Sequence, residues 1–253
     1  MFGVLGASGF DIETRNHAKA ILGGDFAEEI EGLVTALLSF RIPSREIIKS
    51  GGGQAASTMR LRDALYAQGW HKHEFIVRTI VDGVEREATT HEVDHVKRCS
   101  NGTLALEIEW NNKDPFFDRD LENFQRLHAQ GAISLGVLVT RGAALQVHMT
   151  RIVVSAIRSE GILSATELEA WGMKERTARQ TKNLNALLEK QVPFADAFAQ
   201  SFVADKYGAA TTHWAKLDDR IKRGVGNPCP LLLIGLPLAS VGDYSAANEE
   251  LYE

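Results

Sequence analysis

Cysteine is scarce in this 253-residue chain, and long apolar runs and an excess of basic residues are missing. The two cysteines, Cys99 and Cys229, stand apart without CxxC spacing, which favours a protein of the reducing cytoplasm. The longest apolar run, residues 230–241, contains two prolines and is too short to span a bilayer. No basic and apolar leader opens the chain, so we expect no export.

The net charge of −5 argues against a protein that coats nucleic acid without selectivity. A local basic surface stays open, because four cations cluster in one short stretch: Lys216, Arg220, Lys222 and Arg223. With 44% apolar and 24% charged residues, the composition is that of an ordinary globular protein. The length predicts a single domain, 1–253, with a core at about 44–160 and a helical, DNA-contacting part at about 161–253.

Hydrophobic periodicity and turn residues predict an α/β fold. The turn signals are Asp82-Gly83 and the Ser100-Asn101-Gly102 triplet, and Gly51 to Gly53 are expected to form a loop or hinge. The expected elements are helices 26–40 and 44–69, strands 71–81, 84–98 and 103–110, a helix from Pro115 to about 130, a strand 132–139, further helices, and a late strand within 230–238. The strand, helix, strand order predicts a parallel pair, and so a mixed sheet flanked by helices.

The N-terminal segment GVLGASGF invites comparison with a dinucleotide-binding loop, because Gly3, Gly6 and Gly9 recur every third residue. A full strand has no room before them, and Ile12 stands where a further glycine is expected. We therefore interpret the segment as a flexible terminus.

The segment HEVDH, His91 to His95, matches the H-E-x-x-H signature of zinc proteases. That chemistry needs a helix, so that both histidines share one face. The segment lies between two hairpin turns and follows Thr89 and Thr90, which favours a strand. In a strand the two histidines share a face, but Glu92 points away from both. A zinc hydrolase is therefore kept only as an alternative.

Three carboxylates on neighbouring strands form a stronger candidate site. Across the hairpin Asp94 approaches Glu107, and Glu109 projects to the same side as Glu107. Two close carboxylates repel unless they are protonated or bridged by a hard cation. Asp94, Glu107 and the carbonyl of Ile108 would suit magnesium, with manganese as a substitute. The competing interpretation is a solvated acidic sheet edge.

This pattern, D-x12-E-x-E followed by WNNKDPFF, a helix and an apolar strand, resembles the PD-(D/E)xK nucleases. More narrowly it resembles the BglII/BamHI group of type II restriction endonucleases, most clearly over residues 73–141. The resemblance implies that Asp94 and Glu107 bind the metal, and that Glu109 occupies the usual lysine position. It also places the chain after the catalytic strand against DNA.

The DNA contacts implied by this resemblance are Asn111, Asn112, Lys113 and Arg141 as readers of bases, and the cluster Lys216, Arg220, Lys222 and Arg223 as contacts to phosphate. An ordinary polar loop and a solvated helix face are the alternatives for these two sets. We expect a homodimer with the helix 115–130 as its interface, because Arg119, Asp120, Glu122 and Arg126 form its polar side.

The function expected from these features is a magnesium-dependent type II restriction endonuclease that cuts both strands of duplex DNA. The resemblance adds an expected palindromic site, with GATC as its expected centre, and a companion DNA methyltransferase. A repair or structure-selective nuclease on the same core and a non-catalytic DNA-binding protein are the alternatives.

Overall fold

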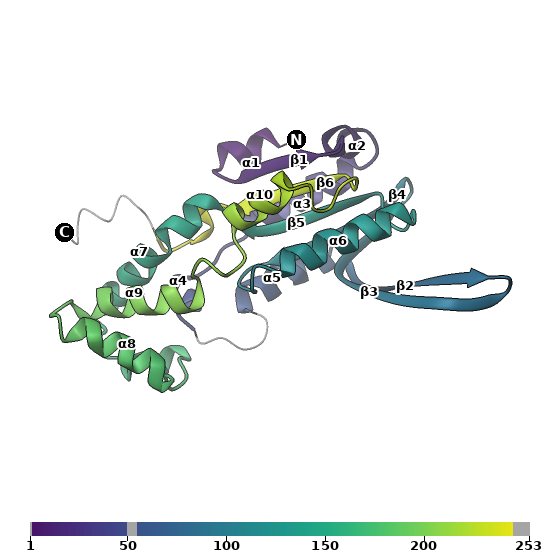
Figure 1. Cartoon of the computed structure of the whole chain (residues 1–253). Coiled ribbons are helices and arrows are strands. Elements are labelled where there is room, and N and C mark those ends of the chain that lie inside the picture. The colour runs from purple at the N-terminus through teal and green to yellow at the C-terminus, as the bar shows by residue number, and fades with distance from the viewer. Residues whose placement is uncertain (1, 50–54, 245–253) are drawn as a thin grey trace.

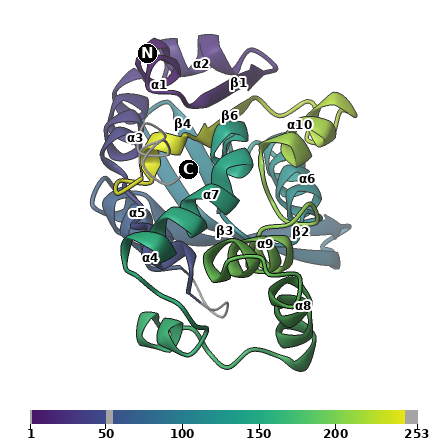
Figure 2. The ribbon, with the colours of Figure 1, turned by 90° about the vertical axis from the view of Figure 1, so that its left-hand side faces the viewer.

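A computed structural model describes residues 2–49 and 55–244 of the chain. One central sheet separates two helical layers (Figures 1 and 2). The predicted glycine loop at Gly51 to Gly53 lies outside the described residues. The α/β architecture confirms the predicted mixed sheet flanked by helices.

The elements in chain order are α1 (Gly3–Ala7), β1 (Asp11–Arg15), α2 (Ala18–Gly24), α3 (Ala27–Ser39), α4 (Ser44–Ile47), α5 (Ala56–Tyr66), β2 (His71–Val81), β3 (Val84–Cys99), β4 (Gly102–Glu109), α6 (Phe116–Ala129), β5 (Leu135–Arg141), α7 (Ala143–Ser159), the 3-10 helix η1 (Glu167–Trp171), α8 (Ala178–Leu188), α9 (Phe194–Lys206), α10 (Trp214–Lys222), β6 (Leu231–Leu236) and the 3-10 helix η2 (Leu238–Ser240).

The strands lie in the order β1-β6-β5-β4-β3-β2. The pairs β2/β3, β3/β4 and β1/β6 are antiparallel, whereas β4/β5 and β5/β6 are parallel. Helix α6 connects the parallel strands β4 and β5, as the strand, helix, strand pattern predicts. The carboxyl ends of β4, β5 and β6 therefore meet at one edge of the sheet, where the acids predicted on β4 also lie.

Each face of the sheet has its own core, because β4 and β5 alternate their side chains between the two faces. Leu106 and Val137 belong to the larger core with α3, α5 and α7. Ala105 and Leu138 belong to the smaller core with α6 and α10. The Cβ of any residue replacing Gly136 would lie 2.5 Å from the ring of Phe124, so glycine lets α6 lie close on β5.

Strands β2 and β3 extend beyond the sheet as a two-stranded arm (Figure 1). Strand β3 pairs with β4 only over His95–Cys99, and the rest of β3 pairs with β2 alone. The turn at the tip is Asp82-Gly83, both with positive φ (52° and 78°), as the two-residue hairpin requires. Several apolar side chains of this arm are exposed: Ile76, Ile80, Val81 and Val84.

The N-terminal segment is ordered into secondary structure, so its interpretation as a flexible terminus was wrong. Helix α1 buries Leu5 completely, and β1 pairs with β6 through five residue pairs. The alternating polar residues of DIETR suit an edge strand, which has one free side. Within the described residues, no helix combines the length and the apolar character needed to cross a membrane.

Candidate active site

The β3/β4 hairpin brings the two predicted metal acids together. The pair beyond His95↔Leu106 in this register is Asp94 and Glu107, and the backbone N–H of Asp94 donates to Glu107 Oε1 over 3.3 Å. Asp94 is exposed, whereas Glu107 is 5% exposed and points into the layer beneath α6. The structure therefore places one solvent-facing and one buried carboxylate side by side.

A β-bulge in β3 sets the direction of Asp94. The register shifts between the pairs His71↔Val96 and His73↔Val93, so β3 contains one extra residue opposite β2 at this point. A bulge of this kind re-aims the side chains beside it. Asp94 consequently lines both a cavity of about 860 Å³ on the α5 side of β4 and one of about 600 Å³ on the α6 side.

The same bulge separates the two histidines of HEVDH. His91 lines the cavity on the α6 side, whereas His95 lines the other cavity and makes an edge contact with the ring of Tyr66. The expectation that the two histidines share a face was therefore wrong, because the extra residue changes the alternation. The segment is a strand, as predicted, and Glu92 pairs with Lys72 at 2.7 Å.

Glu109 lies one pleat beyond Glu107, and Asn112 and Arg119 contact its carboxylate. Its Oε2 accepts a hydrogen bond from Asn112 Nδ2 at 2.7 Å, and Arg119 Nη2 lies 3.7 Å from Oε1. Arg119, on α6, also binds Asp120 Oδ1 at 2.7 Å. The other oxygen of Asp120 is buried and accepts from no N–H or hydroxyl donor in the described part of the chain, but the Asp120 carboxyl lies within hydrogen-bonding reach of Glu109. A fourth carboxylate therefore belongs to this centre.

Burial raises the pKa of all three inner carboxylates. For Glu107 the largest cause is burial, followed by the charges of Asp120 and Asp94. Burial, with the neighbouring Asp120 carboxylate, raises the pKa of Glu109 to about 8, against the effects of Asn112 and Arg119. The pKa of Asp120 is also raised, mainly by burial, although a hydrogen bond with Glu109 and the charge of Arg119 oppose the shift. In this buried cluster the repulsion is relieved by protonation or by a bound cation.

The oxygen donors suit a hard divalent cation. No group of three or more His, Cys, Asp or Glu side chains within residues 2–49 and 55–244 could hold a metal ion by itself. A cation at Asp94 and Glu107 would therefore depend on these two carboxylates, a carbonyl such as that of Ile108, and water. That set fits magnesium, which keeps several waters and binds through one or two carboxylates.

The loop after β4 is fixed to the segment after α9. Asn112 O accepts from the N–H of Thr212, and Lys113 forms a bridge with Thr211. Arg141 joins both segments, because its guanidinium donates to Asn111 Oδ1 at 3.1 Å and to Thr211 Oγ1 at 2.7 Å.

Two of the predicted DNA contacts, Asn111 and Arg141, therefore make hydrogen bonds within the fold. Arg141 is fully buried, so in this structure its side chain holds the loop and does not reach solvent. Asn111 is half-buried and accepts from Arg141, whereas Asn112 and Lys113 are exposed.

The basic cluster of α10 is largely neutralised by carboxylates. Lys216 and Arg220 lie 3.4 and 3.3 Å from Asp114, just before α6. Arg220 is 7% exposed, which favours a structural role for it. The two exposed cations at the end of the helix also form ion pairs: Lys222 lies 2.6 Å from Asp218, and Arg223 lies 3.2 Å from Asp219.

The sequence interpretation misplaced Asp120, which it assigned to the exposed polar side of α6. The structure leaves Asp120 only 2% exposed, beside Glu109. A signal for this was present: Asp120 lies three residues after Phe117 and four before Phe124, within the apolar stripe of the helix. A carboxylate at a core position of a helix next to an acidic strand indicates a shared site.

The raised pKa values predict how the metal-free protein responds to pH. A carboxyl whose folded pKa lies above its unfolded value destabilises the fold at high pH, and this cost disappears as the pH falls. For Glu109, between about 8 folded and 4.5 unfolded, lowering the pH from 8 to 6 should add about 2 kcal/mol. In chelator the Tm should therefore rise by about 5 °C.

Thermal melts of wild type and Glu109→Gln across this pH range would measure the effect. The glutamine removes the titrating group, and its side-chain oxygen can still accept from Asn112. The Tm of the variant should depend on pH much less than that of wild type. Equal pH dependence in the two proteins would show that Glu109 titrates normally.

Comparison with known families gives one result that covers most of the chain. A family model described as Restriction endonuclease BglII/BglIII matches residues 10–236. The matched region includes the acids of β3 and β4, α6, and the late segments α10 and β6. No curated relative matches the chain.

Proposed function

Because the chain belongs to the BglII/BglIII family of restriction endonucleases, and so is a type II site-specific deoxyribonuclease, we propose that it hydrolyses both strands of a short palindromic DNA site with magnesium held at Asp94 and Glu107. The single observation that supports this centre most directly is the contact of Glu107 Oε1 with the backbone of Asp94, between two carboxylates on adjacent strands. The 860 and 600 Å³ cavities that meet at Asp94 give a phosphodiester access to it.

Each residue of the centre has a distinct task in this proposal. Asp94 and Glu107 hold the cation, together with the carbonyl of Ile108, and manganese can replace magnesium there. When bound, the cation supplies Lewis-acid polarisation of the phosphodiester and lowers the pKa of water. The buried position of Glu107 keeps its carboxylate in a fixed orientation.

We assign proton acceptance to Glu109. Asn112 occupies its Oε2, and this leaves Oε1 to take the proton of the attacking water. The water attacks phosphorus in line, and the bond to the leaving oxygen breaks without a covalent intermediate. Arg119 lies beside Oε1 and supplies positive charge where the superfamily commonly has lysine on the strand.

DNA recognition is assigned to the loop after β4 and to α10. Asn112 and Lys113 are exposed beside the centre, where amide and ammonium groups can reach base edges or phosphates. Asn111 and the buried Arg141 set the shape of this loop, so their contribution to recognition is indirect. Lys216, Lys222 and Arg223 contact phosphate in this proposal, after exchange of their carboxylate partners for DNA.

We further propose that the single endonuclease domain, 1–253, acts as a homodimer, because one centre cuts one strand. Helix α6 remains the candidate interface, but with a smaller polar face than the sequence suggested. Arg119, Glu122 and Arg126 are exposed on it, and Asp120 is not. A palindrome centred on GATC, a companion methyltransferase acting on the same site and a cytoplasmic location complete the proposal.

Incubation of supercoiled plasmid with the protein tests the whole assignment. With magnesium or manganese we expect discrete linear fragments, and sequencing of their ends should give one short palindrome with symmetric cuts. Calcium should support DNA binding with cleavage reduced by about 100-fold or more, since it fits the oxygen ligands but activates water poorly.

Other outcomes would separate the alternatives. A smear, or a lone nick as the end product, would contradict the dimeric restriction enzyme and favour a repair nuclease. Metal-independent binding without any cleavage would favour a DNA-binding protein. Activity that requires zinc and is lost in both His91→Ala and His95→Ala would restore the zinc-hydrolase interpretation.

A further inference from the structure

The larger cavity lies on the face of β4 opposite Glu107 and Glu109. It shares Asp94, Ile108 and Asn112 with the carboxylate cavity, so the two hollows are continuous around the end of β4. Its wall carries four cations and two acids: Lys49, Arg62, Lys72 and Lys206 against Glu46 and Asp94. An anionic chain that reaches the carboxylates therefore meets positive charge on the other side of the strand.

Lys206, at the end of α9, is the most enclosed cation of this cavity and has no acidic partner among the described residues. Its Nζ donates to the carbonyl oxygens of Ile47, at 3.1 Å, and Lys49, and it lies 5.1 Å from the ring centre of Tyr207. Burial, together with the charge of Arg141, lowers the pKa of Lys206 to about 8. Within the described residues no carboxylate lies within ion-pair distance of it.

Arg141 is a second cation of the same kind, directly behind the cavity wall. Its guanidinium lies 4.9 Å from the ring centre of Tyr207 and 5.8 Å from that of Trp110, and both rings line the cavity. The side chain is fully buried, its Nε has no hydrogen-bond partner in the described chain, and the groups that accept from its guanidinium, Asn111 and Thr211, are neutral. A buried cation and a partly buried one without a counter-ion carry a desolvation cost that a bound anion would offset.

We propose that a DNA phosphodiester next to the scissile one binds in this cavity at Lys206, with Arg141 behind it as a second positive charge. This inference rests on the proposed cleavage of DNA and adds where the strand runs after it passes Asp94. Lys206 donates to an oxygen of this phosphate, while Asp94 and Glu107 hold the cation at the neighbouring, scissile phosphate. The DNA strand then passes around the end of β4, with the acids on one side of it and the cations on the other.

The salt dependence of DNA binding measures this contact without cleavage. With a 30-base-pair duplex of mixed sequence in calcium, log Kd is plotted against log potassium chloride concentration for each protein. Loss of one phosphate contact should reduce the slope by about 0.9 in Lys206→Met. Lys206→Arg keeps the charge and should keep the slope. The fold of Lys206→Met is checked by its Tm, which should stay close to that of wild type, because the loss of the hydrogen bonds to Ile47 and Lys49 is offset by removal of a partly buried charge.

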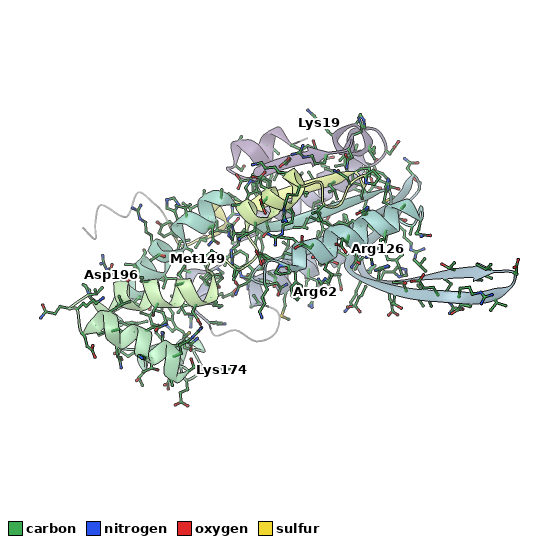
Figure 3. All side chains as sticks on the ribbon, in the orientation of Figure 1. Lys19, Arg62, Arg126, Met149, Lys174 and Asp196 are labelled. Carbon is green, nitrogen blue, oxygen red and sulfur yellow. The ribbon has the colours of Figure 1, made fainter. Side chains whose placement is uncertain are left out.

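Lys19→Met is the matched control, because Lys19 is exposed on α2, well away from Arg62 and the cavity it lines (Figure 3). An unchanged slope in Lys206→Met, beside a wild type that cleaves plasmid, would overturn this inference alone. A wild type that neither binds the duplex nor cleaves would overturn it together with the proposed function. If inorganic phosphate raises the Tm of wild type but not of Lys206→Met, while the DNA slope is equal, the cavity holds a free anion and the DNA contact is refuted.

Discussion

Replacing Asp94 or Glu107 with alanine should reduce plasmid cleavage by more than about 100-fold, the usual minimum for loss of a group that holds the catalytic cation. The two residues lie side by side on β3 and β4, and no other acid of these strands occupies either position. Duplex binding in low divalent metal should be retained or tighter, because an acid facing phosphate has been removed. Cleavage assays and duplex titrations, with circular dichroism as a folding check, give the result.

Glu92→Ala is the informative control for this experiment. Glu92 is an exposed acid on the same strand and pairs with Lys72, so its loss should leave cleavage near wild type. A zinc hydrolase would instead need Glu92 as its general base. More than about a tenth of wild-type activity in Asp94→Ala or Glu107→Ala would remove that residue from the centre.

Glu109→Lys should also be inactive, by about 100-fold or more, although lysine is the commoner residue of the superfamily at that position. In this chain Glu109 is 3% exposed and has the Arg119 guanidinium beside it, so a lysine there would bury a positive charge next to another cation. It would also remove the carboxylate that accepts a hydrogen bond from Asn112, a residue of the proposed recognition loop. Single-turnover cleavage rates of wild type and variant measure the loss.

Glu109→Gln separates shape from chemistry at the same position. Glutamine can keep the hydrogen bond from Asn112 but cannot accept a proton, so it should be slow while binding DNA normally. Near-normal turnover in Glu109→Lys would show that Glu109 only tunes the site, and that Arg119 and lysine can coexist.

The sequence was sufficient for the features that depend on local pattern. Alternation located β2, β3 and β4, and the dipeptide Asp82-Gly83 located the hairpin, because only a few residues tolerate two successive positive φ values. The pairing of Asp94 with Glu107 follows from counting back from the turn at Gly102, so the central acids could be found without coordinates.

Features that depend on packing could not be found in the same way. The bulge at Asp94 depends on which strand accommodates an extra residue, and alternation alone had placed His91 and His95 on one face. Arg141 is the last residue of a fully buried strand, and only the positions of the Trp110 and Tyr207 rings show that its guanidinium is buried. The edge strand β1 is short and polar, and its pairing with β6 joins the two ends of the chain.

The projecting arm of β2 and β3 connects a distant part of the molecule to the candidate centre. Strand β3 runs from the tip at Val84 to Asp94, with one register shift opposite Thr79 and Ile80 and a second beside Asp94, where the arm joins the sheet. Strands bend at such bulges, so the one beside Asp94 is a point where the arm can bend relative to the sheet. A displacement of the arm would therefore move Asp94, which lies at its base, relative to Glu107, which stays paired within the sheet through β4 and β5.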